Sequence, residues 1–200
     1  MPEELSREFG VEVTPRTLLV TYHPVTLEYE STEEEFAELL AALEASGRPA
    51  IFTYPNADTR GRALIRMIDG YVRAHPEARV RENFGTRAYL GLMANAAAMV
   101  GNSSSGIIEA ASFRLPVVDV GMRQRGRARV HNVLTVDGKR AAIAAAIERA
   151  TSAAFRAGLA GLRNPYGDGR AAERIVERLA TQPLDRALIE KSFYRPGMPQ

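Results

Sequence analysis

The residues best suited to chemistry lie in one short segment, residues 99–109, with the sequence MVGNSSSGIIE. This segment joins an apolar run to a helix-like run through small residues that form hydrogen bonds readily. A helix that begins there leaves its first backbone N–H groups without intrahelical partners, and its dipole favours negative charge. The hydroxyls of Ser103, Ser104 and Ser105, followed by Gly106, can complete a cradle for phosphate oxygens. The segment therefore predicts a phosphate site.

Each member of this segment also has a purely structural interpretation. One serine at a helix start is usually a cap, but three serines followed by Gly106 exceed what capping requires. Glu109 is either a carboxylate stabilised by the helix N-terminus or an acceptor for two ribose hydroxyls, and residue types leave both open. No P-loop lysine follows, and the chain has no G-x-G-x-x-G motif, so neither ATP hydrolysis nor a dinucleotide cofactor is indicated.

Three further polar residues follow apolar runs or turns. His23 precedes Pro24 at the end of an apolar run, where an imidazole can contact phosphate or act as an acid, although a lone histidine is usually structural. Asn56 fits turn chemistry and a ligand hydrogen bond equally well. Asp168, in the turn of residues 166–169 (YGDG), is either a cap or a group that reaches a ligand.

Four arginines alternate through residues 121–129, GMRQRGRAR. A charge run of this kind is usually a solvated loop. Beside a phosphate cradle, however, a planar guanidinium is a natural partner for a diphosphate, so we expect at least one arginine to point inward. The spacing leaves open which of the four this is: Arg123, Arg125, Arg127 or Arg129. The loop has no aromatic residue for base stacking, which disfavours a nucleic-acid partner.

Composition excludes several classes of protein. The 200 residues are 46% hydrophobic, enough for an ordinary core, and 26 basic against 24 acidic residues leave a net charge of +2. With no cysteine, disulfides, zinc–thiolate sites and thiol nucleophiles are excluded. We find no metal-ligand pattern, no membrane-spanning run and no signal-peptide pattern, so the expectation is a cytoplasmic protein with no membrane or metal partner.

Strand-like and helix-like segments alternate along the chain. Continuous apolar runs typical of buried parallel strands occupy residues 18–22, 50–54, 97–100, 116–120 and 132–136. Between and after them, apolar residues at helical spacing predict helices around residues 36–43, 64–72, 86–93, 105–113, 138–150 and 169–180. We expect Ser31 and Glu34 to form a capping box, Thr86 to cap the third helix, and His75–Pro76 to end the second.

Repeated strand–helix units of this length predict a doubly wound α/β sheet in a single domain, residues 1–200, with loose or tethering ends at 1–13 and 195–200. In such sheets, ligands bind beyond the carboxyl ends of the strands. His23, Asn56, residues 101–106 and residues 121–129 all follow strands, so they should gather at one edge. This convergence is stronger evidence for a site than any one motif.

Taken together, five motifs in order resemble the hydrolysing UDP-N-acetylglucosamine 2-epimerases, which feed sialic and related nonulosonic acid synthesis. The motifs are HPVT at 23–26, PN at 55–56, GNSSSGIIE at 101–109, GxRQxGR at 121–127 and YGDG at 166–169. The resemblance runs from residue 18 to the last helix. It implies a Rossmann-like domain that corresponds to the carboxyl-terminal half of a two-domain GT-B-type fold, with the amino-terminal half absent.

The resemblance also implies roles. His23 would contact the diphosphate near the leaving oxygen with Asn56 close by, Ser103 and Ser104 would hold phosphate, Glu109 the ribose hydroxyls, and Arg123 the diphosphate. The family converts UDP-N-acetylglucosamine and water into N-acetylmannosamine and UDP by elimination to a glycal, without a cofactor. The acids and bases for proton transfer belong to the amino-terminal half, so this chain should bind UDP and turn over nothing.

Partners and alternatives follow from the same resemblance. The expected partners are a UDP-sugar, either UDP-N-acetylglucosamine or a diacetamido relative, the amino-terminal catalytic half, and further copies in a homo-oligomer. One alternative is the donor-binding domain of a GT-B glycosyltransferase. Another is a non-catalytic nucleotide-sugar-binding module, and a nucleic-acid binder using the arginine loop is a third.

Overall fold

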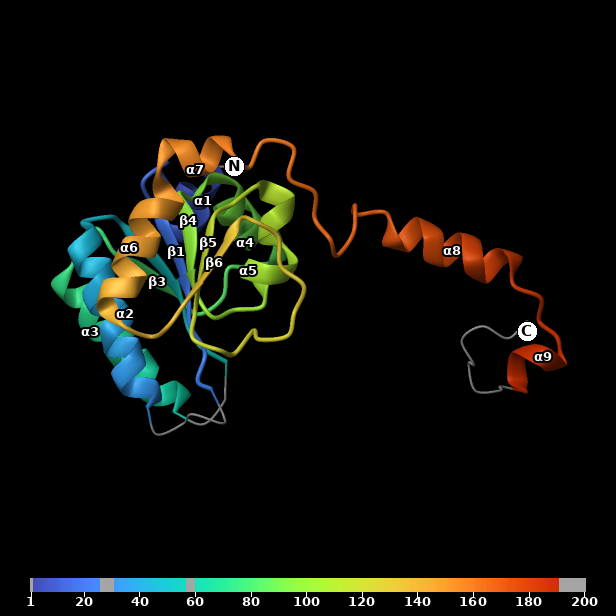
Figure 1. The fold of residues 1–200 in the computed structure, drawn as a ribbon, viewed down its shortest axis with the longest axis horizontal. Coiled ribbons are helices and arrows are strands. Elements are labelled where there is room, and N and C mark those ends of the chain that lie inside the picture. The colour runs from blue at the N-terminus through green and yellow to red at the C-terminus, as the bar shows by residue number, and fades with distance from the viewer. Residues whose placement is uncertain (1, 26–30, 57–59, 191–200) are drawn as a thin grey trace. The chain divides into compact units, whose positions relative to one another are not determined.

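A six-stranded, all-parallel sheet with helices on both faces forms the centre of the computed structural model, which describes residues 2–25, 31–56 and 60–190 (Figure 1). The strands are β1 (Leu18–Thr21), β2 (Ala50–Thr53), β3 (Arg79–Arg81), β4 (Ala98–Gly101), β5 (Val117–Val120) and β6 (Val133–Val136). They lie in the order β3-β2-β1-β4-β5-β6. Strand order therefore changes direction between β1 and β4, and the predicted doubly wound α/β fold is confirmed.

Ten helical segments accompany these strands in the described residues. They are α1 (Pro2–Phe9), α2 (Thr32–Ser46), α3 (Gly61–Ala74), α4 (Gly85–Asn95), α5 (Ser105–Ile108), the 3₁₀ helix η2 (Ala110–Phe113), α6 (Arg140–Thr151), α7 (Ala153–Ala157), α8 (Ala171–Thr181) and α9 (Arg186–Ile189). Two compact units divide the chain, residues 1–166 and 167–200, and only α8 and α9 belong to the second. A single domain over residues 1–200 stays a prediction. Across the described part of the chain, no helix combines the length and hydropathy needed to cross a membrane.

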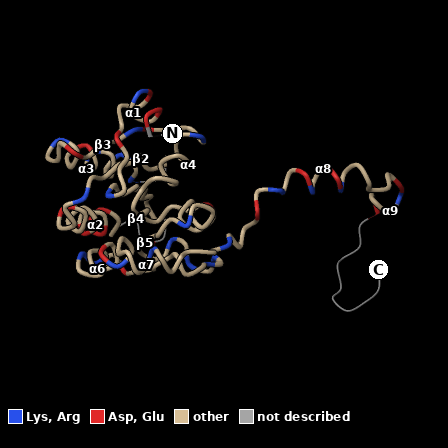
Figure 2. Tube along the Cα trace, turned by 90° about the horizontal axis from the view of Figure 1, so that it is seen from above, with Lys and Arg blue, Asp and Glu red and all other residues tan. Residues whose placement is uncertain are grey.

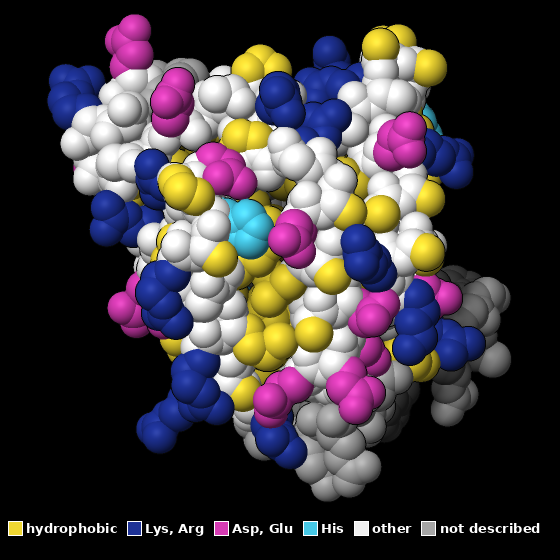
Figure 3. Space-filling view, turned by 90° about the vertical axis from the view of Figure 1, so that its left-hand side faces the viewer, with side chains coloured by type: hydrophobic (Ala, Val, Ile, Leu, Met, Phe, Trp, Pro, Cys, Tyr) yellow, Lys and Arg dark blue, Asp and Glu magenta, His cyan; other side chains and the backbone are white. Residues whose placement is uncertain are grey.

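Two hydrophobic layers enclose the sheet because successive strand residues point to opposite faces. Val20 and neighbours on one face pack with α2, α3 and α6, and Leu19 and neighbours on the other pack with α1 and α4. Leu40, Met67 and Val72 lie partly buried against the first layer. Figure 3 shows a strip of hydrophobic side chains on the side of the molecule where α2 and α3 lie.

The five predicted strands are confirmed to within a residue or two at each end, and one strand was missed. The missed strand, β3, has the sequence RVR, and both of its arginines are exposed. A three-residue edge strand with charged side chains lacks the apolar run that marks a buried strand.

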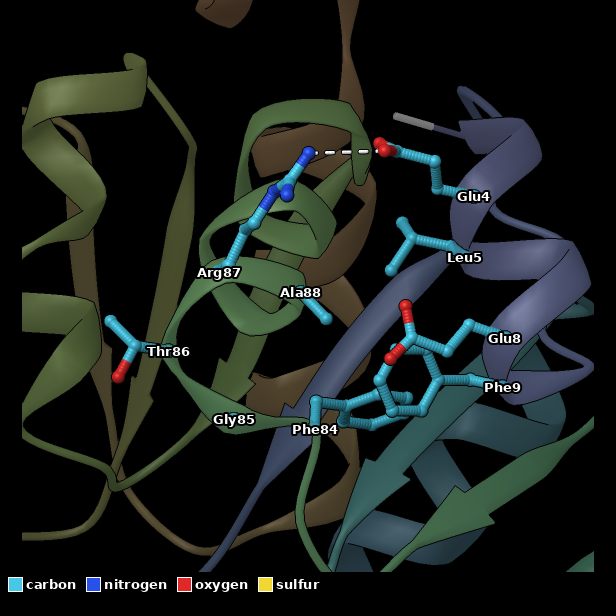
Figure 4. Close-up of a pocket in the computed structure, with 9 residues that line it drawn as sticks. All are labelled: Glu4, Leu5, Glu8, Phe9, Phe84, Gly85, Thr86, Arg87 and Ala88. Atoms are coloured by element: carbon cyan, nitrogen blue, oxygen red, sulfur yellow. Dashed lines mark hydrogen bonds and ion pairs between the residues drawn. The ribbon is translucent and has the colours of Figure 1, made fainter.

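The prediction that residues 1–13 are loose is wrong for the part that the structure describes. Helix α1 packs on α4: Leu5 is 2% exposed, and the rings of Phe9 and Phe84 lie 5.3 Å apart. An ion pair of 3.0 Å joins Glu4 to Arg87, as Figure 4 shows. Apolar burial on one side of this short helix is what fixes it. The predicted loose segment at residues 195–200 lies outside the described residues.

Three helix predictions need correction. Thr86 lies inside α4, whose N-cap is Phe84, so Thr86 is not a cap. Residues 105–113 form two short helices, α5 and η2, with Glu109 between them. Ser31 precedes α2 but makes no side-chain cap hydrogen bond, and its hydroxyl donates to Glu35 Oε1 at 3.2 Å, so the capping box is absent. The first turn of α2 is acidic, with Glu33, Glu34 and Glu35, and these side chains interact favourably with the helix dipole instead. Acidic residues of α2 are red in Figure 2.

Candidate functional site

Asn102 joins the ends of β1 and β4 at the carboxyl edge of the sheet. It follows β4 directly, is 0% exposed, and its backbone N–H donates to Thr21 O at 3.2 Å. Its side chain forms two hydrogen bonds with the backbone of His23: Oδ1 accepts from N at 2.7 Å, and Nδ2 donates to O at 2.8 Å. One buried amide therefore fixes the segment after β1 against the start of the serine turn.

His23 in turn contacts the segment after β2. Its Nδ1 accepts a hydrogen bond of 3.1 Å from the backbone N–H of Asn56. An Nδ1 that accepts must be unprotonated, so the proton of the neutral imidazole is on Nε2. The ring can then donate from Nε2 to an anionic oxygen. His23 and Asn56 are thus brought together, as the edge rule predicts.

The arginine loop reaches the same point from β5. Arg123 Nη1 and Gln124 Nε2 both donate to the backbone carbonyl of Asn102, at 3.2 and 2.7 Å. Arg125 and Arg127 are exposed, so the inward-pointing arginines of the loop are Arg123 and Arg129. The structure therefore places Arg123 beside Asn102, between His23 and the serine turn, and leaves Arg127 at the surface.

Ser103, Ser104 and Ser105 form the turn between β4 and α5. Ser103 is 9% exposed, and the backbone N–H of Ser105 lies 3.4 Å from Ser103 Oγ. No side chain caps α5, whose N-cap is Ser104. Because α5 has four residues, its dipole is weak, and an anion at this turn would depend on the hydroxyls and local N–H groups rather than on a long helix. Glu109 directly follows α5.

Two glycines give this turn its shape. Gly101 has φ +134°, and a Cβ there would lie 2.0 Å from Thr21 O. Gly106 brings α5 close to the sheet, since a Cβ there would lie 2.9 Å from Val117 Cγ1. Glycine at both positions is therefore a requirement of close backbone approach.

A pocket of about 280 Å³ opens beside the serine turn. Its walls include Ser103, Ser105, Thr21, Thr53 and Tyr89. The hydroxyls of Thr21 and Thr53 lie 2.8 Å apart, and the Tyr89 hydroxyl is 3.2 Å from Thr21 Oγ1. Burial raises the pKa of Tyr89, and hydrogen bonds with Thr21, Ser105 and Ser103 oppose the rise. The phenol is therefore a neutral hydrogen-bonding group.

A second pocket, of about 300 Å³, lies between α1 and α4 (Figure 4). It shares Phe84, Gly85 and Thr86 with the first pocket. None of the predicted site residues lines it, so its size alone does not make it the site.

Asp168 belongs to the second unit, residues 167–200, and contacts Arg174 and Arg170 of that unit. Arg174 Nη2 lies 2.6 Å from Asp168 Oδ2, and this hydrogen bond holds the carboxyl pKa below its usual range. Asp168 also accepts from the backbone N–H of Arg170 at 3.1 Å, as a turn residue before α8 does. These contacts agree with the turn interpretation of Asp168.

Sequence reasoning missed Asn102 and Gln124 as site residues. Both are buried, at 0% and 2% exposure, and both lie inside motifs that were singled out for their neighbours. An asparagine between a strand and a serine turn reads as an ordinary turn residue. The one usable signal for Gln124 was that it is uncharged in a loop with four arginines, and an uncharged polar side chain is easier to bury than a guanidinium.

An open, doubly wound sheet with polar side chains at the β1/β4 switch point defines an α/β protein of the kind that binds ligands at that edge. Sequence comparison then identifies the family: residues 3–180 match the model of UDP-N-acetylglucosamine 2-epimerase. The chain belongs to this family, as the motifs predicted.

Individual relatives agree with this assignment. The chain is 36% identical over 93% of its length to the UDP-N,N'-diacetylbacillosamine 2-epimerase (hydrolyzing) of Legionella pneumophila, and covers 48% of it. It is 36% identical over 66% of its length to the GDP/UDP-N,N'-diacetylbacillosamine 2-epimerase (hydrolyzing) of Campylobacter jejuni, covering 35%. The chain thus spans about half the length, or less, of the relatives it matches.

A solved structure shows the same fold. The UDP-GlcNAc 2-epimerase of Methanocaldococcus jannaschii, in complex with UDP-GlcNAc and UDP, aligns with a TM-score of 0.66 at 19% identity. The alignment covers 89% of this chain and 48% of that one. The architecture is therefore that of one half of a two-domain, GT-B-type fold.

Proposed function

We propose that this chain is the UDP-binding half of a hydrolysing UDP-sugar 2-epimerase. The observation that carries the proposal is the convergence on Asn102, which directly precedes the serine turn and forms hydrogen bonds of 2.7–3.2 Å with the backbone of His23 and with Arg123. These groups offer an imidazole, hydroxyls and a guanidinium within one short stretch of the sheet edge. That set suits a diphosphate.

The proposed placement of UDP follows the sequence motifs. The diphosphate lies between the serine turn, including Ser105 and Gly106, and Arg123. His23 faces the oxygen that leaves the sugar, and Asn56 lies beside it. Glu109 accepts hydrogen bonds from the two ribose hydroxyls. Arg127 and Asp168 are secondary candidates, since one is exposed and the other is paired with Arg174.

In the proposed reaction, this half of the enzyme stabilises the negative charge on the departing UDP. A base removes the proton at C2 of the sugar while the C1–O bond breaks, and the bonding electrons leave with the β-phosphate of UDP. Water then adds at C1, and a proton returns to C2 from the opposite face, which gives N-acetylmannosamine from UDP-N-acetylglucosamine. Arg123, the serines and His23 stabilise the departing charge. The two diacetylbacillosamine epimerases among the relatives leave a diacetamido sugar as the other candidate substrate.

Binding of UDP is the first test. We expect Arg123→Ala to weaken the affinity for UDP by about tenfold or more, because it removes a charge-assisted contact to the diphosphate. Isothermal titration of UDP into each variant measures this. Arg125→Ala is the matched control, since Arg125 lies in the same loop and is exposed. Equal affinity in wild type and Arg123→Ala, or an equal loss in both variants, would contradict the placement.

Turnover is the second test. The proton-transfer residues are proposed to lie in the other half, so the chain alone should release no N-acetylmannosamine or diacetamido sugar from the UDP-sugar. Chromatography of the products after prolonged incubation detects a free sugar. Sustained release by the chain alone, abolished by His23→Ala, would show that it carries the whole reaction.

A further inference from the structure

Asp119 and Arg129 form an ion pair beneath the arginine loop, with Arg129 Nη2 3.1 Å from Asp119 Oδ2. Asp119 lies in β5, and its side chain is 2% exposed. The same oxygen accepts from Thr135 Oγ1 at 3.2 Å. Burial raises the pKa of Asp119, and the hydrogen bond and charge of Arg129 oppose that rise.

Arg129 also forms hydrogen bonds with the backbone of the loop that contains it. Its Nη2 donates to Gln124 O at 2.7 Å, and its Nη1 donates to Arg127 O at 3.2 Å. One guanidinium therefore links the strand β5 to two carbonyls of the loop. On the opposite side, Arg123 and Gln124 donate to Asn102 O. The loop is held between these two attachments.

Stability alone does not account for this network. Removing a carboxylate and a guanidinium from water is costly, and an apolar pair of similar volume is often at least as stable. In addition, Gln124 Oε1 and Arg129 Nε are buried without hydrogen-bond partners in the described structure. Unlike an apolar pair, Asp119 and Arg129 can fix the orientation of the loop, because each hydrogen bond from Arg129 holds one loop carbonyl relative to β5.

We propose that Asp119 and Arg129 are positioning residues that hold the loop of residues 121–129 so that Arg123 faces the serine turn. The proposal rests on the proposed function, in which Arg123 binds the diphosphate of UDP. Neither Asp119 nor Arg129 touches the ligand. They influence the affinity for UDP indirectly, through the loop backbone and Arg123.

The decisive variant is the double substitution Asp119→Leu with Arg129→Met, which replaces the pair by apolar side chains of similar size. We expect its midpoint of urea unfolding to fall less than that of Asp119→Asn, because both charges are removed together and only neutral groups such as Gln124 O and Thr135 Oγ1 lose a partner. Its affinity for UDP should nevertheless fall about tenfold, because the loop loses its orientation. Asp119→Asn, which leaves Arg129 without its counter-charge, should lower both the stability and the affinity.

Two further readouts separate positioning from a general structural role. Amide hydrogen exchange of the ligand-free chain should be faster at residues 122–128 in the double variant and unchanged in β1 and β4. With Arg123→Ala as the background, the double substitution should cause no further loss of UDP affinity, since the coupled effects are non-additive. Losses that multiply would overturn the assignment.

Wild-type affinity together with wild-type loop exchange in the folded double variant would also overturn the proposal. If wild-type protein itself binds no UDP, the proposed function fails, and the exchange of residues 122–128 alone decides whether the pair anchors the loop. Faster exchange confined to the loop supports the anchor, and unchanged exchange refutes it.

Discussion

Replacing Asn102 by alanine is expected to weaken UDP binding about 100-fold and to lower the free energy of unfolding by about 2–3 kcal/mol. The side chain is fully buried, and both of its polar atoms are bonded to the backbone of His23. Truncation leaves those two backbone groups without their partners and frees the His23 segment. The backbone carbonyl of Asn102 remains in the variant, so Arg123 keeps its contact. The loss of UDP affinity therefore acts through His23.

The matched control for this prediction is Asn95→Ala. Asn95 also uses its side-chain amide on a backbone carbonyl, donating to Gly91 O at 2.8 Å, but within α4. It should leave the affinity for UDP unchanged. Titration calorimetry and urea unfolding give the two quantities. In an Asn102→Ala background, His23→Ala should cost little further affinity, and a full additional loss would refute the route through His23.

Replacing Gly101 by alanine is expected to cost about 3 kcal/mol or more of folding stability, enough to prevent accumulation of folded protein. A Cβ at this position would lie 2.0 Å from Thr21 O and 2.8 Å from Thr21 C, both backbone atoms of the adjacent strand. The residue also has φ +134°, which L side chains rarely adopt. Strands β1 and β4 would have to separate at the point where the site is built.

Gly47→Ala separates the two causes of this loss. Gly47 has φ +56° at the C-cap of α2, with no atom within 4 Å of a built Cβ. It should therefore show only the cost of a left-handed backbone, about 1 kcal/mol. Denaturant unfolding of both variants compares them directly. A loss at Gly101 no greater than that at Gly47 would show that the adjacent strand accommodates the methyl group.

Local sequence determined the sheet and the edge on which the site lies. Strands β1 (LLVT) and β5 (VVDV) are mostly apolar, and a short, mostly apolar run can be recognised as a buried strand without tertiary information. The parallel topology then required His23, the serine turn and the arginine loop to gather at one edge, because each follows a strand. The structure confirms that gathering through Asn102.

Tertiary structure decided what lies between those motifs. Asn102 contacts His23 across 79 positions of the chain, and α1 docks on α4 across more than 80. Spacing in the sequence cannot report such contacts, because side-chain burial depends on the elements packed around a residue. Among four arginines alternating at equal spacing, the fold alone placed Arg129 against the buried carboxylate of Asp119 and Arg123 against the backbone carbonyl of Asn102. Residue types supplied groups suited to binding phosphate, and three-dimensional packing selected which of them lie at the carboxyl edge of the sheet.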